Sequence, residues 1–175
     1  MSDTAPDQWK DAIYEALRQA NVRLVAYVPD AGHARVIERV HAEGDMKGVV
    51  LTTEEEGVAF CCGAWLGGER AVLLMQSSGV GNCINMLSLV ENCRFPLVAL
   101  VTMRGEWAEF NQWQEPMGRA TQAALELMGV KVMRAERAED VGPMAAASLE
   151  SAFRSDQATA VLLAQWLIGR KEWTK

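Results

Sequence analysis

Short runs of apolar residues, separated by segments with helical periodicity, constrain the fold more than any other feature of this sequence. The runs are apolar at consecutive positions, which is typical of strands buried on both faces of a parallel sheet. Parallel strands need long crossover connections, and the helical segments supply them. The predicted strands span 22–28, 48–51, 71–75, 97–101, 130–133 and 159–164. The predicted helices span 8–20, 33–43, 54–66, 82–93, 117–128 and 138–153.

This alternation predicts the α/β fold class. We expect a single three-layer domain over residues 1–175, with a mostly parallel sheet of about six strands and helices on both faces. A chain of 175 residues buries a sizeable core without disulfide or metal staples. Half of the residues are hydrophobic and 23% are charged, which excludes an intrinsically disordered chain.

Charge and cysteine usage exclude several classes of partner. The net charge of -6 leaves no basic footprint for nucleic acid, and no polybasic run favours a membrane surface. No apolar stretch is long enough to predict a transmembrane helix, and the acidic start of the chain is unlike a signal peptide. The apolar surroundings and irregular spacing of the cysteines predict buried thiols, no metal site in this chain and a cytoplasmic protein. These cysteines are Cys61, Cys62, Cys83 and Cys93.

Polar residues follow four of the predicted strands. In open parallel sheets, ligands bind at the carboxyl ends of the strands. Here those ends are the segments 29–30, 52–54, 76–79 and 102–104. We therefore expect any chemistry of the chain to lie in these four segments.

Three adjacent glutamates, Glu54, Glu55 and Glu56, begin the helix that follows the second predicted strand. Thr53 and Glu56 have the spacing of a capping box, and acidic residues in a first turn suit the helix dipole. These effects account for Glu56 and in part for Glu55. Glu54 lies at the first helical position, where its carboxylate either stays at the helix end or points into a site.

The other candidates each have a functional and a structural interpretation. Gly79 and Gly81 either let the backbone of residues 76–82 approach a ligand closely or only make a tight turn. This segment lacks the third glycine of a dinucleotide-binding fingerprint and does not follow the first strand. Arg104 either meets an anionic substrate or lies on the surface. His33 is either a proton donor or polar ligand, or a structural histidine.

Several segments resemble one enzyme family. The segment 54–65, which begins Glu-Glu-Glu-Gly, resembles the helix of thiamine-diphosphate enzymes whose first Glu binds the cofactor's aminopyrimidine, with Gly63 at the expected distance from Glu54. The segments 28–30, 75–85, 104–106 and 116–119 also match the family. Together they resemble the alpha subunit of sulfopyruvate decarboxylase and the matching part of phosphonopyruvate decarboxylase, over roughly residues 10–165. Two departures are Ala31, where a serine is frequent, and His33, which lies outside the pattern.

The resemblance implies the pyrimidine domain of the thiamine-diphosphate-binding fold. It also implies a decarboxylase (carboxy-lyase) that converts 3-sulfopyruvate or phosphonopyruvate to an aldehyde and CO₂. It assigns activation of the cofactor to Glu54, and we expect His33 to act as a catalytic residue near the reacting carbon. Asp30 and Arg104 are assigned to the substrate, Arg104 to its anionic tail. The residues assigned to cofactor binding are Pro29, Glu54, Gln76, Ser77, Gly79, Gly81 and Asn82.

A second chain is also implied by the resemblance. The diphosphate half of the family carries Gly-Asp-Gly and a later pair of asparagines, which hold Mg²⁺ and the diphosphate. Here Gly44 and Asp45 are followed by Met46, so the motif is missing, and no residues remain for a second domain of similar size. The implied partner is a beta subunit carrying Gly-Asp-Gly, which shares thiamine diphosphate and Mg²⁺ with this chain in a hetero-oligomer.

Three alternatives stay open. An acetolactate-synthase-like carboligase subunit would keep the cofactor and release a coupled ketol in place of an aldehyde. A non-catalytic ligand-binding or regulatory module would be a stable monomer without a partner. A flavodoxin-like nucleotide binder would hold a phosphate at residues 77–79 and would show the absorption of a flavin.

Overall fold

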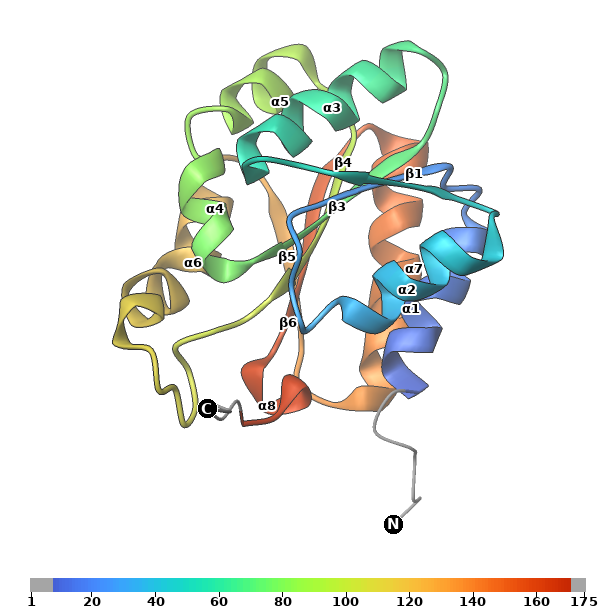
Figure 1. Cartoon of the computed structure of the whole chain (residues 1–175). Coiled ribbons are helices and arrows are strands. Elements are labelled where there is room, and N and C mark those ends of the chain that lie inside the picture. Colours follow the sequence, from blue (N-terminus) through green and yellow to red (C-terminus); the bar gives the residue numbers. More distant parts are fainter. Residues whose placement is uncertain (1–7, 171–175) are drawn as a thin grey trace.

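All strands among the described residues belong to one parallel sheet (Figure 1). The computed structural model describes residues 8–170. The strands are β1 (Leu24–Tyr27), β2 (Lys47–Val50), β3 (Ala71–Gln76), β4 (Leu97–Thr102), β5 (Lys131–Ala135) and β6 (Ala158–Leu163). Their order across the six-stranded sheet is β2-β1-β3-β4-β6-β5, and every neighbouring pair is parallel. The predicted α/β class is confirmed, and the sheet is parallel throughout.

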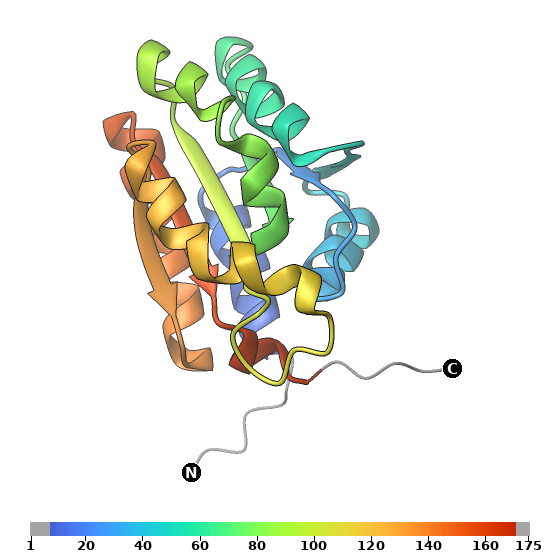
Figure 2. The same ribbon diagram turned by 90° about the vertical axis from the view of Figure 1, so that its left-hand side faces the viewer.

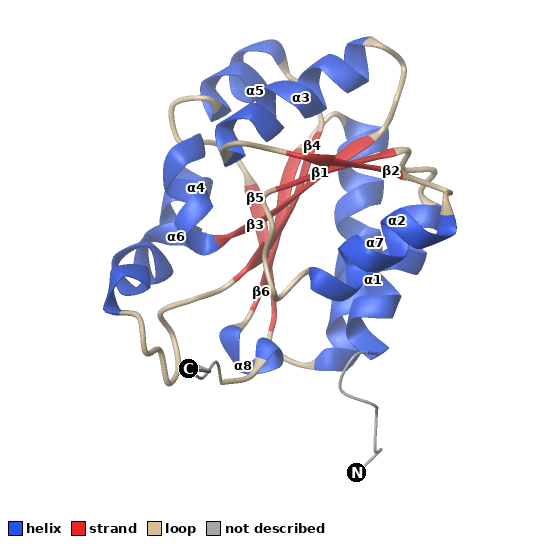
Figure 3. Ribbon diagram, viewed as in Figure 1, coloured by secondary structure: helices blue, strands red, loops and turns tan. Residues whose placement is uncertain are grey.

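Helices cover both faces of the sheet and complete the three predicted layers (Figure 3). One face carries α1 (Gln8–Gln19), α2 (Ala34–Glu43) and α7 (Ala138–Ser155). The other face carries α3 (Glu54–Leu66), α4 (Ser77–Cys83), α5 (Leu87–Cys93) and α6 (Glu115–Leu127). The 3-10 turn η1 (Gln112–Gln114) precedes α6, and the short helix α8 (Gln165–Ile168) follows β6. Over residues 8–170, no helix has the length and apolar character needed to cross a membrane.

The core lies on both sides of the central strands, as the apolar runs predict. All six residues of β4 are buried, because β3 and β6 flank this strand and helices cover both of its faces. Val98 and Leu100 pack in the core under α1, α2 and α7. Leu97, Ala99 and Val101 point the other way, into the core under α3 to α6.

The structure differs from the predicted elements around α4. The segment 76–81, predicted as a turn, is helical from Ser77 onward, and the single helix predicted over 82–93 is divided into α4 and α5. The α8 helix was not predicted. Of the cysteines, Cys93 is exposed, so its predicted burial is wrong, while the other three are buried and all four are free.

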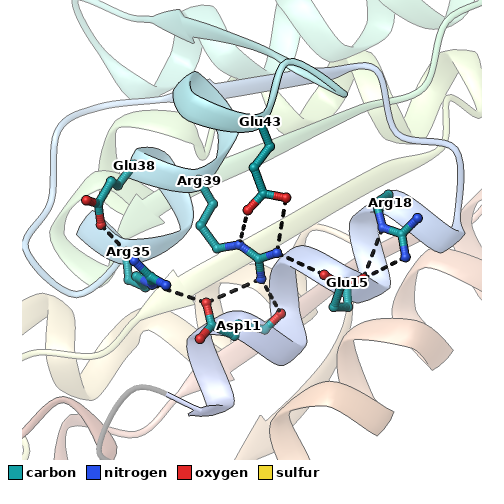
Figure 4. A network of polar contacts seen from close by, with 7 residues as sticks. All are labelled: Asp11, Glu15, Arg18, Arg35, Glu38, Arg39 and Glu43. Carbon is teal, nitrogen blue, oxygen red and sulfur yellow. Dashed lines mark hydrogen bonds and ion pairs between the residues drawn. The ribbon is translucent and has the colours of Figure 1, made fainter.

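A network of ion pairs joins α1 to α2 on the face opposite α3 and α4 (Figure 4). The Arg39 guanidinium contacts Glu15 at 2.9 Å and Asp11 at 3.3 Å on α1, and it also pairs with Glu43. It lies over the Tyr14 ring, 4.0 Å from the ring centre. These contacts hold α2 against α1 and serve the fold.

The strand order places a topological switch point between β1 and β3. From β1 the chain moves outward to β2, and from β3 it moves to β4 on the opposite side. The connections that leave β1 and β3 therefore diverge, and such a switch point is where parallel sheets bind ligands. Figure 2, which turns the molecule by 90°, shows α4 and the start of α6 side by side at this end of the sheet.

Candidate functional site

Glu54 is the first residue of α3, and it is 8% exposed, whereas Glu55 and Glu56 are exposed. Thr53 makes no side-chain capping bond. Instead, Glu56 Oε2 accepts a hydrogen bond from the backbone N–H of Thr52 at 2.8 Å. The predicted capping box between Thr53 and Glu56 is therefore wrong, because Glu56 caps the helix one residue earlier. Glu54 takes no part in capping.

Two residues of α4, Asn82 and Gly79, contact the Glu54 carboxyl group. Asn82 Nδ2 donates a hydrogen bond to Glu54 Oε2 at 2.8 Å. Gly79 lies one turn earlier, and a Cβ at this position would overlap the carboxyl carbon and Oε1 of Glu54. Cys83 lies next to this carboxyl group. Burial and then the negative charge of Glu54 raise the pKa of the Cys83 thiol to about 12, so the thiol stays neutral.

The close approach of Gly79 to Glu54 gives a testable prediction. We expect Gly79→Ala to lower any turnover that depends on Glu54 about ten- to a hundred-fold, because the added methyl group displaces the Glu54 carboxyl. Helix propensity alone favours alanine over glycine by about 1 kcal/mol, so the loss is not expected to come from α4 unfolding. Thermal unfolding measured beside kcat separates the two effects. Ser78→Ala, at the preceding position, is the control and should keep wild-type kcat.

A second polar cluster lies at the switch point, across the ends of β1, β3 and β4. Asp30 is 8% exposed. Its Oδ1 accepts a hydrogen bond from Gln76 Nε2, and its Oδ2 accepts one from Thr102 Oγ1 at 2.6 Å. Gly32 gives this cluster room, because a Cβ there would meet Thr102 and Asp30. The structure thus brings the predicted residues Asp30 and Gln76 together, and Thr102 is a member that the sequence reasoning missed.

His33 lies inside the core. Its side chain has no exposed surface, and Nε2 lies 3.0 Å from the backbone oxygen of Leu100. A carbonyl oxygen only accepts, so Nε2 carries the hydrogen, and Nδ1 has no hydrogen-bond partner among the described residues. Burial lowers the pKa of the His33 imidazole, which keeps the ring neutral. The catalytic place of His33 beside the reacting carbon stays a prediction, and a ring without exposed surface argues against it.

Arg104 is paired within this chain. Its Nε donates to Glu109 Oε2 at 2.7 Å and its Nη2 to Glu109 Oε1 at 2.6 Å, and the two side chains are only 6% and 3% exposed. Burial by itself raises the pKa of Glu109, but hydrogen bonds from Arg104 and from the backbone of Asn111 and Gly105 outweigh it and lower the pKa to about 2. The Arg104 charge is therefore already balanced within this chain, which argues against its role at a substrate tail; that role stays a prediction.

The Arg104–Glu109 pair belongs to a network that holds the loop between β4 and α6. Gln165 is buried at the start of α8. Its Oε1 accepts the backbone N–H of Glu106 at 2.8 Å and of Trp107 at 3.0 Å, and its Nε2 donates to Glu109 at 2.9 Å. Neither Glu109 nor Gln165 was predicted, because a loop has no periodicity that would reveal such partners.

The other predicted residues serve mainly to place α4. The Ser77 hydroxyl accepts a hydrogen bond from the backbone N–H of Arg104 at 3.1 Å. Gly81 faces α6, where an added Cβ would lie 3.2 Å from the Met117 sulfur. Pro29 is exposed directly before Asp30. The predicted residues at the carboxyl edge therefore divide into polar groups that bond to one another there and groups that fix the α4 helix.

Comparisons with known sequences identify the family of this chain. Residues 8–125 match the family model described as thiamine pyrophosphate enzyme, N-terminal TPP binding domain. The sulfopyruvate decarboxylase subunit alpha of Methanococcus maripaludis is 32% identical over 154 residues, which cover 87% of this chain and 92% of that protein. The same subunit of Methanothermobacter thermautotrophicus is 35% identical over 158 residues, covering 87% and 93%. The phosphonopyruvate decarboxylase of Streptomyces viridochromogenes is 38% identical over 108 residues, covering 61% and 27%.

Solved structures share the fold at low sequence identity. Benzoylformate decarboxylase from Polynucleobacter necessarius has a TM-score of 0.71 and 17% identity, and the match covers 95% of this chain and 31% of that chain. The 2-oxoglutarate:ferredoxin oxidoreductase from Magnetococcus marinus has a TM-score of 0.71 and 15% identity, covering 94% and 31%. The chain therefore belongs to the thiamine pyrophosphate enzyme family, through its N-terminal TPP binding domain, and to the group that contains the sulfopyruvate decarboxylase alpha subunits.

Proposed function

We propose that this chain is the pyrimidine-binding subunit of a two-subunit thiamine-diphosphate-dependent decarboxylase. Its substrate is a 2-oxo acid with a second anionic group. The observation that carries the proposal is the Glu54 carboxyl group, which is buried at the carboxyl edge of the sheet and held by Asn82 against Gly79. Because the chain belongs to the thiamine pyrophosphate enzyme family, we assign this carboxyl group to binding of the cofactor.

The residues around Glu54 fit the aminopyrimidine ring of thiamine diphosphate. Asn82 occupies Glu54 Oε2 only, and Oε1 has no hydrogen-bond partner among the described residues. One carboxyl oxygen thus stays available to a ring nitrogen. When bound, thiamine diphosphate supplies a carbon nucleophile and takes up the electrons that remain after CO₂ leaves.

This chain contributes orientation and one proton transfer. Glu54 holds the ring nitrogen and exchanges a proton with it through Oε1, which is the work of a buried general acid and base. Pro29, Gln76 and Gly79 form the surroundings of the ring, while Ser77 and Gly81 act by fixing α4. Asp30, held by Gln76 and Thr102, faces the substrate.

We propose 3-sulfopyruvate as the substrate, with phosphonopyruvate as its close analogue. The names of the relatives support this choice. Because Glu109 balances the Arg104 charge, we assign Arg104 to the loop and expect the partner subunit to supply the cation for the anionic tail.

The beta subunit completes the site in this proposal. Three relatives carry the name subunit alpha, which supports a second chain. Over residues 8–170, no group of three His, Cys, Asp or Glu side chains is placed to hold a metal ion. We therefore assign Mg²⁺ and the diphosphate to a beta chain with Gly-Asp-Gly. We place the complex in the cytoplasm, which free cysteines favour.

The test is to purify the tagged chain from its native cells, sequence the chain that co-purifies, and assay the pair with 3-sulfopyruvate. We expect a partner with Gly-Asp-Gly, and release of CO₂ and an aldehyde that requires both chains, thiamine diphosphate and Mg²⁺. A coupled ketol product would identify a carboligase instead. A monomer without partner or turnover would support a regulatory module and contradict the proposal.

A further inference from the structure

The hydrogen bond between Asn82 and Glu54 makes the two carboxyl oxygens of Glu54 unequal. A carboxylate only accepts hydrogen bonds, so the amide presents Nδ2 to it. The Nδ2 to Oε2 distance of 2.8 Å is typical of a charge-assisted hydrogen bond. Asn82 itself is exposed on α4, so its amide is held there by this bond and not by packing.

This geometry restricts where a proton on Glu54 resides. Oε2 already accepts the amide hydrogen. A proton on that oxygen would use one of its lone pairs and make it a poorer acceptor, which would weaken the bond from Asn82. Oε1 lies against Gly79, where no side chain interferes, and it has no hydrogen-bond partner among the described residues. A proton on Oε1 leaves the bond to Asn82 intact.

We propose that Asn82 is a positioning residue that confines the exchanging proton of Glu54 to Oε1. The inference rests on the proposed function, because it concerns the same carboxyl group. It also changes the role of Asn82, which was expected to bind the cofactor directly. Asn82 acts through Glu54: it fixes the rotation of the carboxyl group and leaves one oxygen to face the cofactor ring.

The test uses the assembled complex with thiamine diphosphate and Mg²⁺ bound and no substrate. It measures how fast the C2 proton of the cofactor exchanges for deuterium after transfer to D₂O. We expect Asn82→Ala to slow exchange about ten-fold or more, which is the loss of one hydrogen bond to a charged group. Asn82→Asp has nearly the same shape as asparagine, and it should slow exchange further because two carboxylates then face each other. The dissociation constant of the cofactor, measured by calorimetry, should change less than the exchange rate.

A matched control separates this role from charge and packing. Asn92 is exposed on α5, where its Nδ2 donates to the backbone oxygen of Ser88. Asn92→Asp adds the same charge away from Glu54, and the C2 proton of the cofactor should exchange at the wild-type rate in this variant. Wild-type exchange in Asn82→Asp would overturn the inference, since a packing role tolerates an isosteric residue. Unchanged exchange in Glu54→Gln would instead overturn the proposed function, and the inference about Asn82 with it.

Discussion

Replacing Glu54 with glutamine is expected to lower kcat of the assembled complex about a thousand-fold, within the range for loss of a general acid and base. Glutamine keeps the length of the side chain, and its amide oxygen still accepts a hydrogen bond from Asn82. It has no ionisable oxygen, so it cannot exchange a proton with the cofactor. Release of CO₂ measures kcat, and gel filtration shows whether the two chains still assemble, as we expect.

The neighbouring glutamate is the control for this variant. Glu55 is exposed on the same turn of α3, so Glu55→Gln removes one negative charge without touching the buried carboxyl group. We expect it to retain wild-type kcat. Turnover at the wild-type level in Glu54→Gln would refute the assignment of the proton transfer to this residue. Loss of turnover in Glu55→Gln alone would move the role to Glu55.

The sheet could be predicted from the sequence because its strands carry their own signal. Buried parallel strands are apolar at every position, and the fully buried β4, predicted over 97–101, spans Leu97–Thr102. The α4 helix carried no such signal, since serine and two glycines in a short segment indicate a turn. This segment is helical because Gly79 and Gly81 let it approach Glu54 and Met117, which come from distant parts of the chain.

A residue of the candidate site could be predicted only where its position at a strand end by itself places it at the carboxyl edge of the sheet. Glu54 and Asp30 follow strand ends and Gln76 is the last residue of β3, and the structure places all three at the carboxyl edge of the sheet. Spacing does not show in which direction a side chain turns. His33 turns into the core and Arg104 turns to Glu109 in an irregular loop, and neither direction could be read from their positions after strand ends.

The loop after β4 depends on one buried ion pair. Replacing Glu109 with glutamine is expected to lower the free energy of unfolding by about 3–5 kcal/mol, because it leaves the Arg104 guanidinium charged and buried without a counterion. Domains of this kind are stable by only about 5–15 kcal/mol, so the loss is a large fraction of the total. Urea unfolding of the variant and the wild type measures the difference.

The Arg104–Glu109 pair should also make the free energy of unfolding depend on pH. The pKa of Glu109 is lowered to about 2 in the folded chain, below its ordinary value near 4.5. A carboxyl group with a lowered pKa binds fewer protons in the folded state than in the unfolded state, so it adds stability above pH 4.5. That stability should fall as the pH decreases from 4.5 through about 2. Glu109→Gln should lack this component.

Two further variants decide whether the effect comes from an unpaired buried charge. Glu115 and Arg119 form an exposed pair at 3.8 Å, so Glu115→Gln should change the free energy of unfolding by less than about 1 kcal/mol. In the double variant Arg104→Met with Glu109→Leu, both charges are gone, and most of the stability should return. If Glu109→Gln destabilised the chain no more than Glu115→Gln, the pair would not hold the loop. The Arg104 guanidinium would then be available to an anion, and Arg104 would return as a candidate for substrate binding.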